Sequence, residues 1–297
     1  MPSEDQIKQM TEGRGFIAAL DQSGGSTPKA LALYGIPEDR YSSEAEMFDL
    51  VHEMRTRIVR SPAFSGDKVL GAILFEKTME RDFAGVPAPR FLWEQKGVVP
   101  FLKIDKGLAQ AEDGVRLMKP NPDLDALLDR ALAHGIFGTK ERSVIDAASP
   151  SGIAAVVAQQ FEIARQVLDK GLVPIVEPEV TITIPDKEEA ERLLLKEITA
   201  QLDALPEGRQ VILKLSLPTM PNFYAPLVVH DRVMRVVALS GGYTREEACK
   251  LLAQNTGVIA SFSRALTEGL TADQDDAAFD RTLQEAVDAI YAASVAG

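Results

Sequence analysis

VILKLSLPTM, Val211–Met220, is an apolar stretch rich in β-branched and aliphatic residues that contains one lysine, Lys214. Gly208 precedes the run Val211–Leu215 and Pro218 follows it, as expected for a short strand with turns at both ends. A continuous apolar run of this length is typical of the buried strands of a parallel sheet. The stretch therefore predicts an α/β fold with a charged side chain at a buried position.

The alternation of side chains along a strand assigns this lysine to a face. Ile212 and Lys214 should share one face, while Val211, Leu213 and Leu215 share the other. Burial disfavours the ammonium form, whose ordinary pKa is about 10.4, and a neutral amine can attack a carbonyl carbon to form a Schiff base. Two other interpretations stay open: the side chain could extend to solvent, or it could pair with a buried carboxylate.

The composition excludes several classes of protein. The chain has 297 residues, a net charge of -12 and no block of basic residues, which argues against nucleic acid or an anionic membrane as a partner. One cysteine, Cys249, allows no internal disulfide and fits a reducing compartment. The first ten residues are too charged for a signal peptide, and no apolar run reaches about 18 residues. We therefore predict a cytoplasmic protein.

Seven further buried runs alternate with helical patterns along the chain. The eight predicted strands lie within residues 15–21, 68–75, 98–107, 136–143, 171–180, 211–215, 233–240 and 257–266. With no linker and no change of composition, this alternation predicts one (β/α)8 TIM barrel, an α/β fold. The single domain covers residues 1–297, with an N-terminal helix at 1–12 and a C-terminal helix at 273–297. A doubly wound open sheet is the alternative.

Charged and small residues lie at the carboxyl ends of the predicted strands, where barrels carry their active sites. They are Asp21, Lys103, Lys140, Arg142, Glu177, Lys214, Ser240, Gly241 and Arg264. The strand of Lys140 places Arg142 on the same face, and two such cations call for an anionic neighbour. Glu177 and Glu179 share a face of the next strand, so they could transfer protons, bind a metal or neutralise the lysines.

Two Ser-Gly-Gly turns precede predicted helices. The first, in QSGGSTP after Asp21, has Pro28 at a helix start, and the second is SGGYTREEA, in which Thr244 and Glu247 predict a capping box. Backbone N–H groups at such a turn can bind an anion such as phosphate. An ordinary capped turn is the alternative.

Several motifs together resemble the class I fructose-bisphosphate aldolases, the metal-independent family that forms a Schiff base. The motifs, in chain order, are AALDQSGGS, FLKIDKG, GTKERS, PIVEPEV, LKLSLP, LSGGY and FSRAL. The resemblance spans residues 15–266 and is strongest to short bacterial members. It implies a (β/α)8 barrel and the reversible cleavage of fructose 1,6-bisphosphate in glycolysis and gluconeogenesis.

The resemblance also implies a role for each matching residue. Lys214 would form the imine, Glu177 would act as general acid and base, Asp21 would face the C4 hydroxyl, and Lys140 and Lys103 would add positive charge. Substrate contacts are implied at Ser23, Ser26, Lys103, Arg142, Ser240, Gly241, Gly242 and Arg264. An arginine that vertebrate members carry after the first strand is absent, with Lys29 the nearest cation, and we predict no role for a C-terminal tyrosine.

Other functions fit the sequence less well. A metal-dependent aldolase needs several ligating histidines, and His52, His134 and His230 lack ligand spacing. No GxGxxG follows a strand, as a nicotinamide enzyme would require. Two phosphate turns argue against a Schiff-base barrel for monophosphates, such as transaldolase or deoxyribose-phosphate aldolase, and a binding protein without catalysis would not need a depressed lysine. We predict a sugar phosphate as the ligand, no cofactor and no metal; the oligomeric state stays open.

Overall fold

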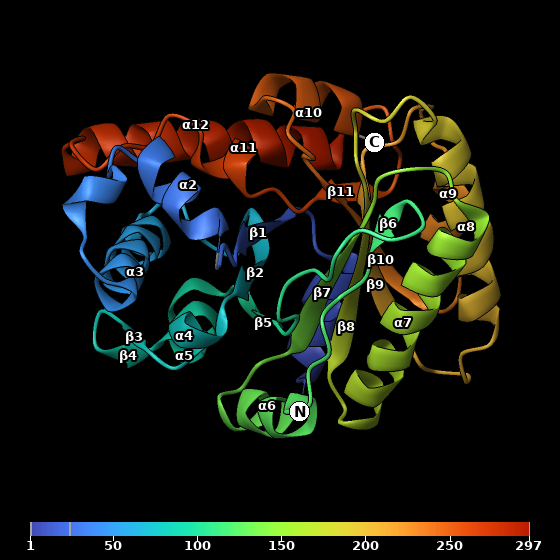
Figure 1. Cartoon of the computed structure of the whole chain (residues 1–297). Coiled ribbons are helices and arrows are strands. Elements are labelled where there is room, and N and C mark those ends of the chain that lie inside the picture. Colours follow the sequence, from blue (N-terminus) through green and yellow to red (C-terminus); the bar gives the residue numbers. More distant parts are fainter. Residues whose placement is uncertain (1, 24, 297) are drawn as a thin grey trace.

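The computed structural model describes residues 2–23 and 25–296, with the side chain of Ser26 left aside. Eight parallel strands form one sheet whose neighbours follow the order of the chain (Figure 1). They are β1 (Phe16–Leu20), β2 (Val69–Leu74), β5 (Val99–Lys103), β7 (Gly138–Ile145), β8 (Val173–Val180), β9 (Val211–Ser216), β10 (Val233–Leu239) and β11 (Val258–Ala260).

The sheet closes into a barrel between its first and last strands. The backbone N–H of Ala19 in β1 donates to the carbonyl oxygen of Phe262, just after β11, at 3.0 Å. An open doubly wound sheet would leave these two edges apart. The prediction of a (β/α)8 barrel is confirmed, and the alternative was wrong.

Helices surround the barrel on its outside. The longer ones are α2 (Ser26–Leu33), α3 (Glu44–Arg60), α6 (Leu124–Ala133), α7 (Pro150–Asp169), α8 (Lys187–Asp203), α10 (Arg245–Leu252) and α12 (Asp276–Val295). Short helices are α4 (Glu76–Met79), α5 (Ala88–Arg90), α9 (Ala225–Val228), α11 (Arg264–Thr267), the 3-10 turn η1 (Glu38–Arg40) and the π-helical turn η2 (Phe91–Gln95). In Figure 1, α7 and α8 run side by side along one flank.

Small additions that the sequence pattern did not predict complete the fold. The strands β3 (Asp82–Phe83) and β4 (Val86–Pro87) form a hairpin, and β6 (Val115–Arg116) pairs antiparallel with β7.

The predicted N-terminal helix is α1 (Glu4–Glu12), which lies at the amino ends of the strands. There Arg235 of β10 donates hydrogen bonds to the carbonyl oxygens of Met10 and Thr11, at 3.0 and 2.6 Å.

The alternation of side chains creates two apolar layers. Val211, Leu213 and Leu215 of β9 belong to the large cluster between strands and helices, while Ile212 belongs to the cluster that fills the barrel interior. Because Lys214 shares the face of Ile212, it lies inside the barrel, one pleat above the apolar filling. The predicted faces of this strand are confirmed.

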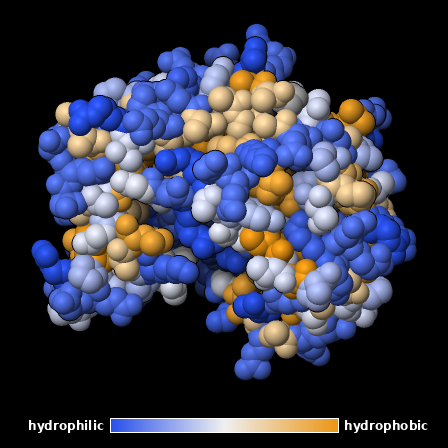
Figure 2. Space-filling model, turned by 90° about the horizontal axis from the view of Figure 1, so that it is seen from above, coloured by the Kyte–Doolittle hydropathy of each residue, from blue (hydrophilic) through white to orange (hydrophobic). Residues whose placement is uncertain are grey.

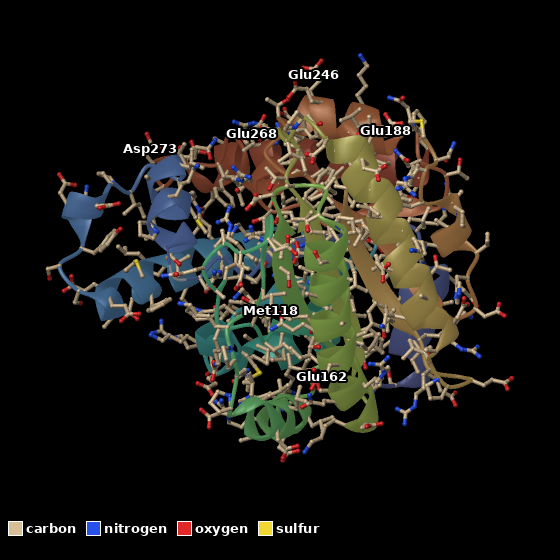
Figure 3. The ribbon with its side chains drawn as sticks, turned by 45° about the vertical axis from the view of Figure 1, so that its right-hand side comes forward. Met118, Glu162, Glu188, Glu246, Glu268 and Asp273 are labelled. Atoms are coloured by element: carbon tan, nitrogen blue, oxygen red, sulfur yellow. The ribbon has the colours of Figure 1, made fainter. Side chains whose placement is uncertain are left out.

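The outer surface is largely polar. Acidic residues project outward from the helices, as Glu162 of α7, Glu188 of α8 and Glu246 of α10 show in Figure 3. In Figure 2, hydrophilic residues cover most of the face seen from above, and hydrophobic residues form scattered patches. None of the helices in the described part of the chain has an apolar stretch long enough to span a bilayer.

Candidate active site

The site begins where the apolar filling of the barrel ends. Ile175 in β8 and Ile212 in β9 are register partners and both belong to the interior cluster. Two residues further along, the same faces carry Glu177 and Lys214, so these side chains meet at one level above the filling. The same step leads from Ala19 to Asp21 beyond β1. The strand faces that point into the barrel therefore carry apolar side chains at one level and charged side chains two residues further along.

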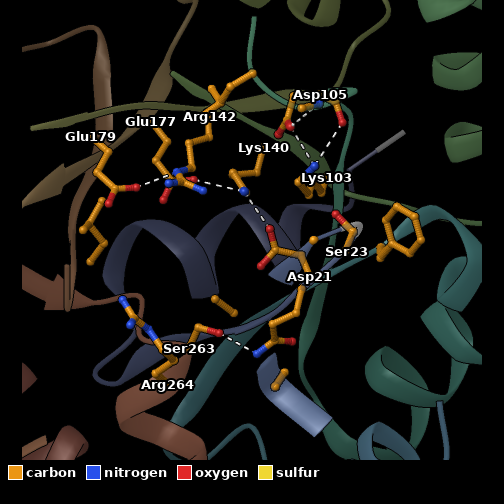
Figure 4. A pocket seen from close by; sticks show the side chains of 18 of the residues that line it. Asp21, Ser23, Lys103, Asp105, Lys140, Arg142, Glu177, Glu179, Ser263 and Arg264 are labelled. Atoms are coloured by element: carbon orange, nitrogen blue, oxygen red, sulfur yellow. Dashed lines mark hydrogen bonds and ion pairs between the residues drawn. The ribbon is translucent and has the colours of Figure 1, made fainter. Parts of the chain in front are cut away.

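Four side chains of this layer form a continuous chain of ion pairs. Glu177 Oε1 lies 3.2 Å from Lys214 Nζ, and Glu177 Oε2 lies 3.0 Å from Lys140 Nζ. Lys140 Nζ also lies 2.6 Å from Asp21 Oδ2, so this lysine sits between two carboxylates (Figure 4). The exposed fractions are 8% for Asp21, 3% for Lys140, 4% for Glu177 and 4% for Lys214. Four charges out of water at this spacing are retained only when each has an opposite partner.

The surroundings fix the charge of two of these groups. Burial disfavours the carboxylate of Asp21, but the nearby ammonium groups of Lys140, Lys214 and Lys103 outweigh it and hold the pKa of Asp21 well below its ordinary value. Burial also disfavours the Lys140 ammonium, but Asp21 and Glu177 outweigh it and raise the pKa of Lys140. At neutral pH the site therefore holds a fixed cation beside a fixed anion.

The pairing of Lys214 with Glu177 bears on an alternative that the sequence left open. The lysine is buried and paired with a carboxylate; it does not extend to solvent. A carboxylate at 3.2 Å is also within reach to take a proton from the amine and return it later. The distance of 3.2 Å between Lys214 Nζ and Glu177 Oε1 thus fits both an ion pair and proton transfer.

Two further ion pairs flank the central chain. Lys103 Nζ lies 2.7 Å from Asp105 Oδ1, and Arg142 Nε lies 2.5 Å from Glu179 Oε2 (Figure 4). The charge of Glu179 overcomes burial and raises the pKa of Arg142. The two cations predicted to share a face of β7, Lys140 and Arg142, are thus balanced by carboxylates of the protein itself.

The second glycine turn has the backbone and the free charge that an anion site needs. Gly241 and Gly242 have φ angles of +60° and +114°, which side chains rarely adopt. A Cβ atom at Gly242 would lie 3.6 Å from Arg264 Nη2, so the guanidinium lies against this turn. No described carboxylate forms an ion pair with Arg264, and its side chain is exposed. Ser240 at the end of β10 completes the group.

A single cavity joins these groups. Its volume is about 740 Å³, and among its lining residues are Ser23, Lys103, Arg142, Ser240, Gly241 and Arg264, besides the four of the central ion-pair chain. Lys29, Lys77, Lys106 and Lys119 also reach it. Although the chain is acidic overall, the cavity is rich in cations, which favours a phosphorylated ligand.

The comparisons with known proteins agree with this geometry. The family model for fructose-bisphosphate aldolase class-I matches residues 4–203. Fructose-bisphosphate aldolase class 1 of Synechocystis sp. is 56% identical over 294 residues, which cover 99% of this chain and 98% of the relative. The chain belongs to the class I fructose-bisphosphate aldolase family. A second member, from Porphyromonas gingivalis, is 53% identical over 293 residues and covers 99% of both chains.

A solved structure shows that the aldolase barrel is kept at much lower identity. The fructose-bisphosphate aldolase of Plasmodium falciparum, solved with TRAP and a small-molecule inhibitor, superposes with a TM-score of 0.77 at 20% identity. The match covers 98% of this chain and 93% of that one. At this identity the likeness supports the fold of this aldolase-family member.

Most of the residues predicted for the aldolase site lie together in the cavity. Gly242 lies beside it, next to Arg264, and the side chain of Ser26 is outside what the structure describes. The three histidines do not line the cavity, and the described residues include no group of three or more His, Cys, Asp or Glu suited to a metal ion.

Sequence reasoning missed three residues of this neighbourhood. Asp105 pairs with Lys103, while Gln22 and Ser263 line the cavity and hydrogen-bond to each other at 2.6 Å. Each lies one or two residues from a predicted site residue, just beyond a strand. That position was the available signal, but polar side chains after strands are too common to single out.

Proposed function

We propose that Lys214 forms the Schiff base through which this member of the family reversibly cleaves fructose 1,6-bisphosphate. The products are dihydroxyacetone phosphate and glyceraldehyde 3-phosphate. One observation carries the assignment: Lys214 Nζ lies 3.2 Å from the Glu177 carboxylate, inside a cavity rich in cations. Iminium formation by a lysine amine is accelerated by an adjacent group that moves protons.

The first half of the reaction prepares the electron sink. Glu177 takes a proton from the Lys214 ammonium group, the resulting neutral amine adds to C2 of the open-chain ketose, and Glu177 returns the proton to the oxygen that leaves as water. The product is a positively charged iminium on C2. Lys140 stays protonated between Asp21 and Glu177, and this keeps the carboxylates in place.

The second half breaks the carbon bond. A base removes the proton of the C4 hydroxyl, the C3–C4 bond breaks, and its electron pair moves to the iminium, which gives an enamine and releases glyceraldehyde 3-phosphate. Asp21, held as a carboxylate, is suited to accept a hydrogen bond from the C4 hydroxyl. Protonation at C3 and addition of water release dihydroxyacetone phosphate and restore the amine.

Phosphate recognition orients the substrate for these steps. We assign one phosphate to Ser240, Gly241, Gly242 and Arg264. We assign the other phosphate to Ser23 and Ser26. Binding energy from two remote phosphates can hold the reacting carbons in position. The proposed ligand is thus a sugar phosphate, and a cytoplasmic location remains a prediction, for which the single cysteine is one ground.

Borohydride trapping tests the proposal. Reduction in the presence of dihydroxyacetone phosphate should fix the adduct on the peptide that contains Lys214, as read by mass spectrometry. Lys214→Met should abolish both trapping and cleavage, whereas the exposed Lys250→Met should change neither. Label found on other lysines alone would reject the assignment.

A further inference from the structure

The two sides of the cavity meet at the seam where the barrel closes. Beside the backbone bond from Ala19 to Phe262, Gln22 Nε2 donates a hydrogen bond to Ser263 Oγ at 2.6 Å; in Figure 4 its dashed line ends at Ser263. Gln22 comes directly before Ser23, and Ser263 directly before Arg264. One side-chain hydrogen bond therefore joins the two segments that carry the assigned phosphate contacts.

The backbone of Gln22 is anchored in its turn by a buried arginine of α3. Arg55 Nη2 donates to the carbonyl oxygen of Gln22 at 2.5 Å, and Arg55 Nη1 donates to Thr78 Oγ1 of α4 at 2.7 Å. The side chain is 0% exposed, and no carboxylate of the described residues forms an ion pair with it. The carbonyl of Gln22 thus replaces the acid that a buried guanidinium ordinarily requires.

This arrangement is costly for the fold. Burial lowers the pKa of Arg55 to about 10, although the charge of Asp21 acts in the opposite direction. An apolar residue would fill the same space without burying an unpaired charge. Arg55 instead ties the backbone of Gln22 to Thr78 of α4, and we explain this buried cation by the position that it gives to the segment after Asp21.

We propose that Gln22, anchored by Arg55, is a positioning residue that fixes the spacing between the two phosphate-binding sides of the cavity. The inference rests on the proposed function, because it assumes that Ser23 and Arg264 contact opposite phosphates. A substrate with two phosphates needs both sides at the right distance. A substrate with one phosphate tolerates a change of that distance.

The experiment compares fructose 1,6-bisphosphate with fructose 1-phosphate in the full-length protein. Gln22→Ala and Ser263→Ala should each lower kcat/KM for the bisphosphate by about three- to tenfold, the range for one neutral hydrogen bond, with most of the change in KM. The value for fructose 1-phosphate should change much less. The double variant should resemble each single variant, because both remove the same bond.

A second pair of variants tests the anchor. Arg55→Met should lower the same ratio of bisphosphate to monophosphate activity. Thr78→Val, which removes only one partner of Arg55, should lower the ratio more weakly and serves as the test if Arg55→Met does not fold. Arg57→Met is the matched control, since Arg57 lies on the same helix but donates to Gln274 on another side, at 2.5 Å. It should leave the ratio unchanged.

Three results would overturn the inference: an equal loss for both substrates, additive losses in the double variant, or an unchanged ratio in Gln22→Ala. Borohydride trapping with dihydroxyacetone phosphate separates this failure from failure of the proposed function. The positioning variants should still be trapped at Lys214. If the unmodified protein is not trapped at Lys214, the proposed function itself fails.

Discussion

Glu177 and Lys214 face each other from neighbouring strands, with Oε1 and Nζ 3.2 Å apart. Their strands are in register two residues earlier, where Ile175 pairs with Ile212 inside the barrel. The apolar pair sets the level at which the acid and the amine meet. The other oxygen of the same carboxylate lies 3.0 Å from Lys140, so Glu177 connects the amine to a fixed cation.

Removing the charge of Glu177 should damage catalysis more than folding. Glu177→Gln keeps the size of the side chain but cannot exchange protons with Lys214, and general acid-base groups contribute about 10²- to 10⁴-fold. We expect kcat to fall by that order, with slower borohydride trapping. Glu188→Gln, on the exposed face of α8, is the control. A Glu177→Gln variant with ordinary kcat would contradict the proton-transfer role.

Arg264 should contribute to substrate binding and little to stability. Its side chain is exposed and forms no ion pair within the described chain, so Arg264→Met breaks no internal charge pair. Charged hydrogen bonds to a phosphate are worth about 1.5–3 kcal/mol, which predicts a KM roughly 10- to 100-fold higher at nearly unchanged Tm. Arg281→Met, on the exposed side of α12, should change neither quantity. An unchanged KM for Arg264→Met would remove this residue from the phosphate site.

Glu141 should make the fold less stable as pH rises. It is 0% exposed on the outward face of β7, neither carboxyl oxygen has a hydrogen-bond partner among the described residues, and burial, with the charge of Asp105, raises its pKa well above 4.5. Above pH 4.5 the unfolded chain releases this proton while the folded protein keeps it, so the free energy of unfolding falls with pH.

Glu141→Gln removes this titration and should therefore raise Tm at neutral pH. The gain should shrink as the pH is lowered toward 4.5, and below that pH the unfolded chain also holds the proton. Thermal unfolding between pH 4.5 and 8 measures the effect, with the exposed Glu162→Gln as control. A gain that is independent of pH would mean that Glu141 is not protonated in the folded protein.

Chelation should not affect turnover. In the proposed reaction the iminium at Lys214 accepts the electron pair, so no metal ion is required at that step. We expect full activity after incubation with EDTA and dialysis, measured by coupled release of glyceraldehyde 3-phosphate. If activity is lost and then returns with added zinc, the metal-dependent mechanism is favoured instead.

The sequence alone determined the features that depend on neighbours along the chain. Strand alternation assigned Ile212 and Lys214 to one face, and the predicted capping box of α10 is present, with Thr244 and Glu247 bonded reciprocally. Charged residues at the carboxyl ends of the buried runs predicted which end of the barrel carries the cavity. These inferences hold because the period of a strand and the geometry of a helix start are set within a few residues.

Only the tertiary structure decided which groups meet across the barrel. The sequence could not show that Lys140 pairs with both Asp21 and Glu177, or that Gln22 reaches Ser263, 241 residues away. It could not show that β1 and β11 close the sheet, which rejects the open alternative. Such contacts depend on strand register and on the stagger of a closed barrel, and these are properties of all eight strands together.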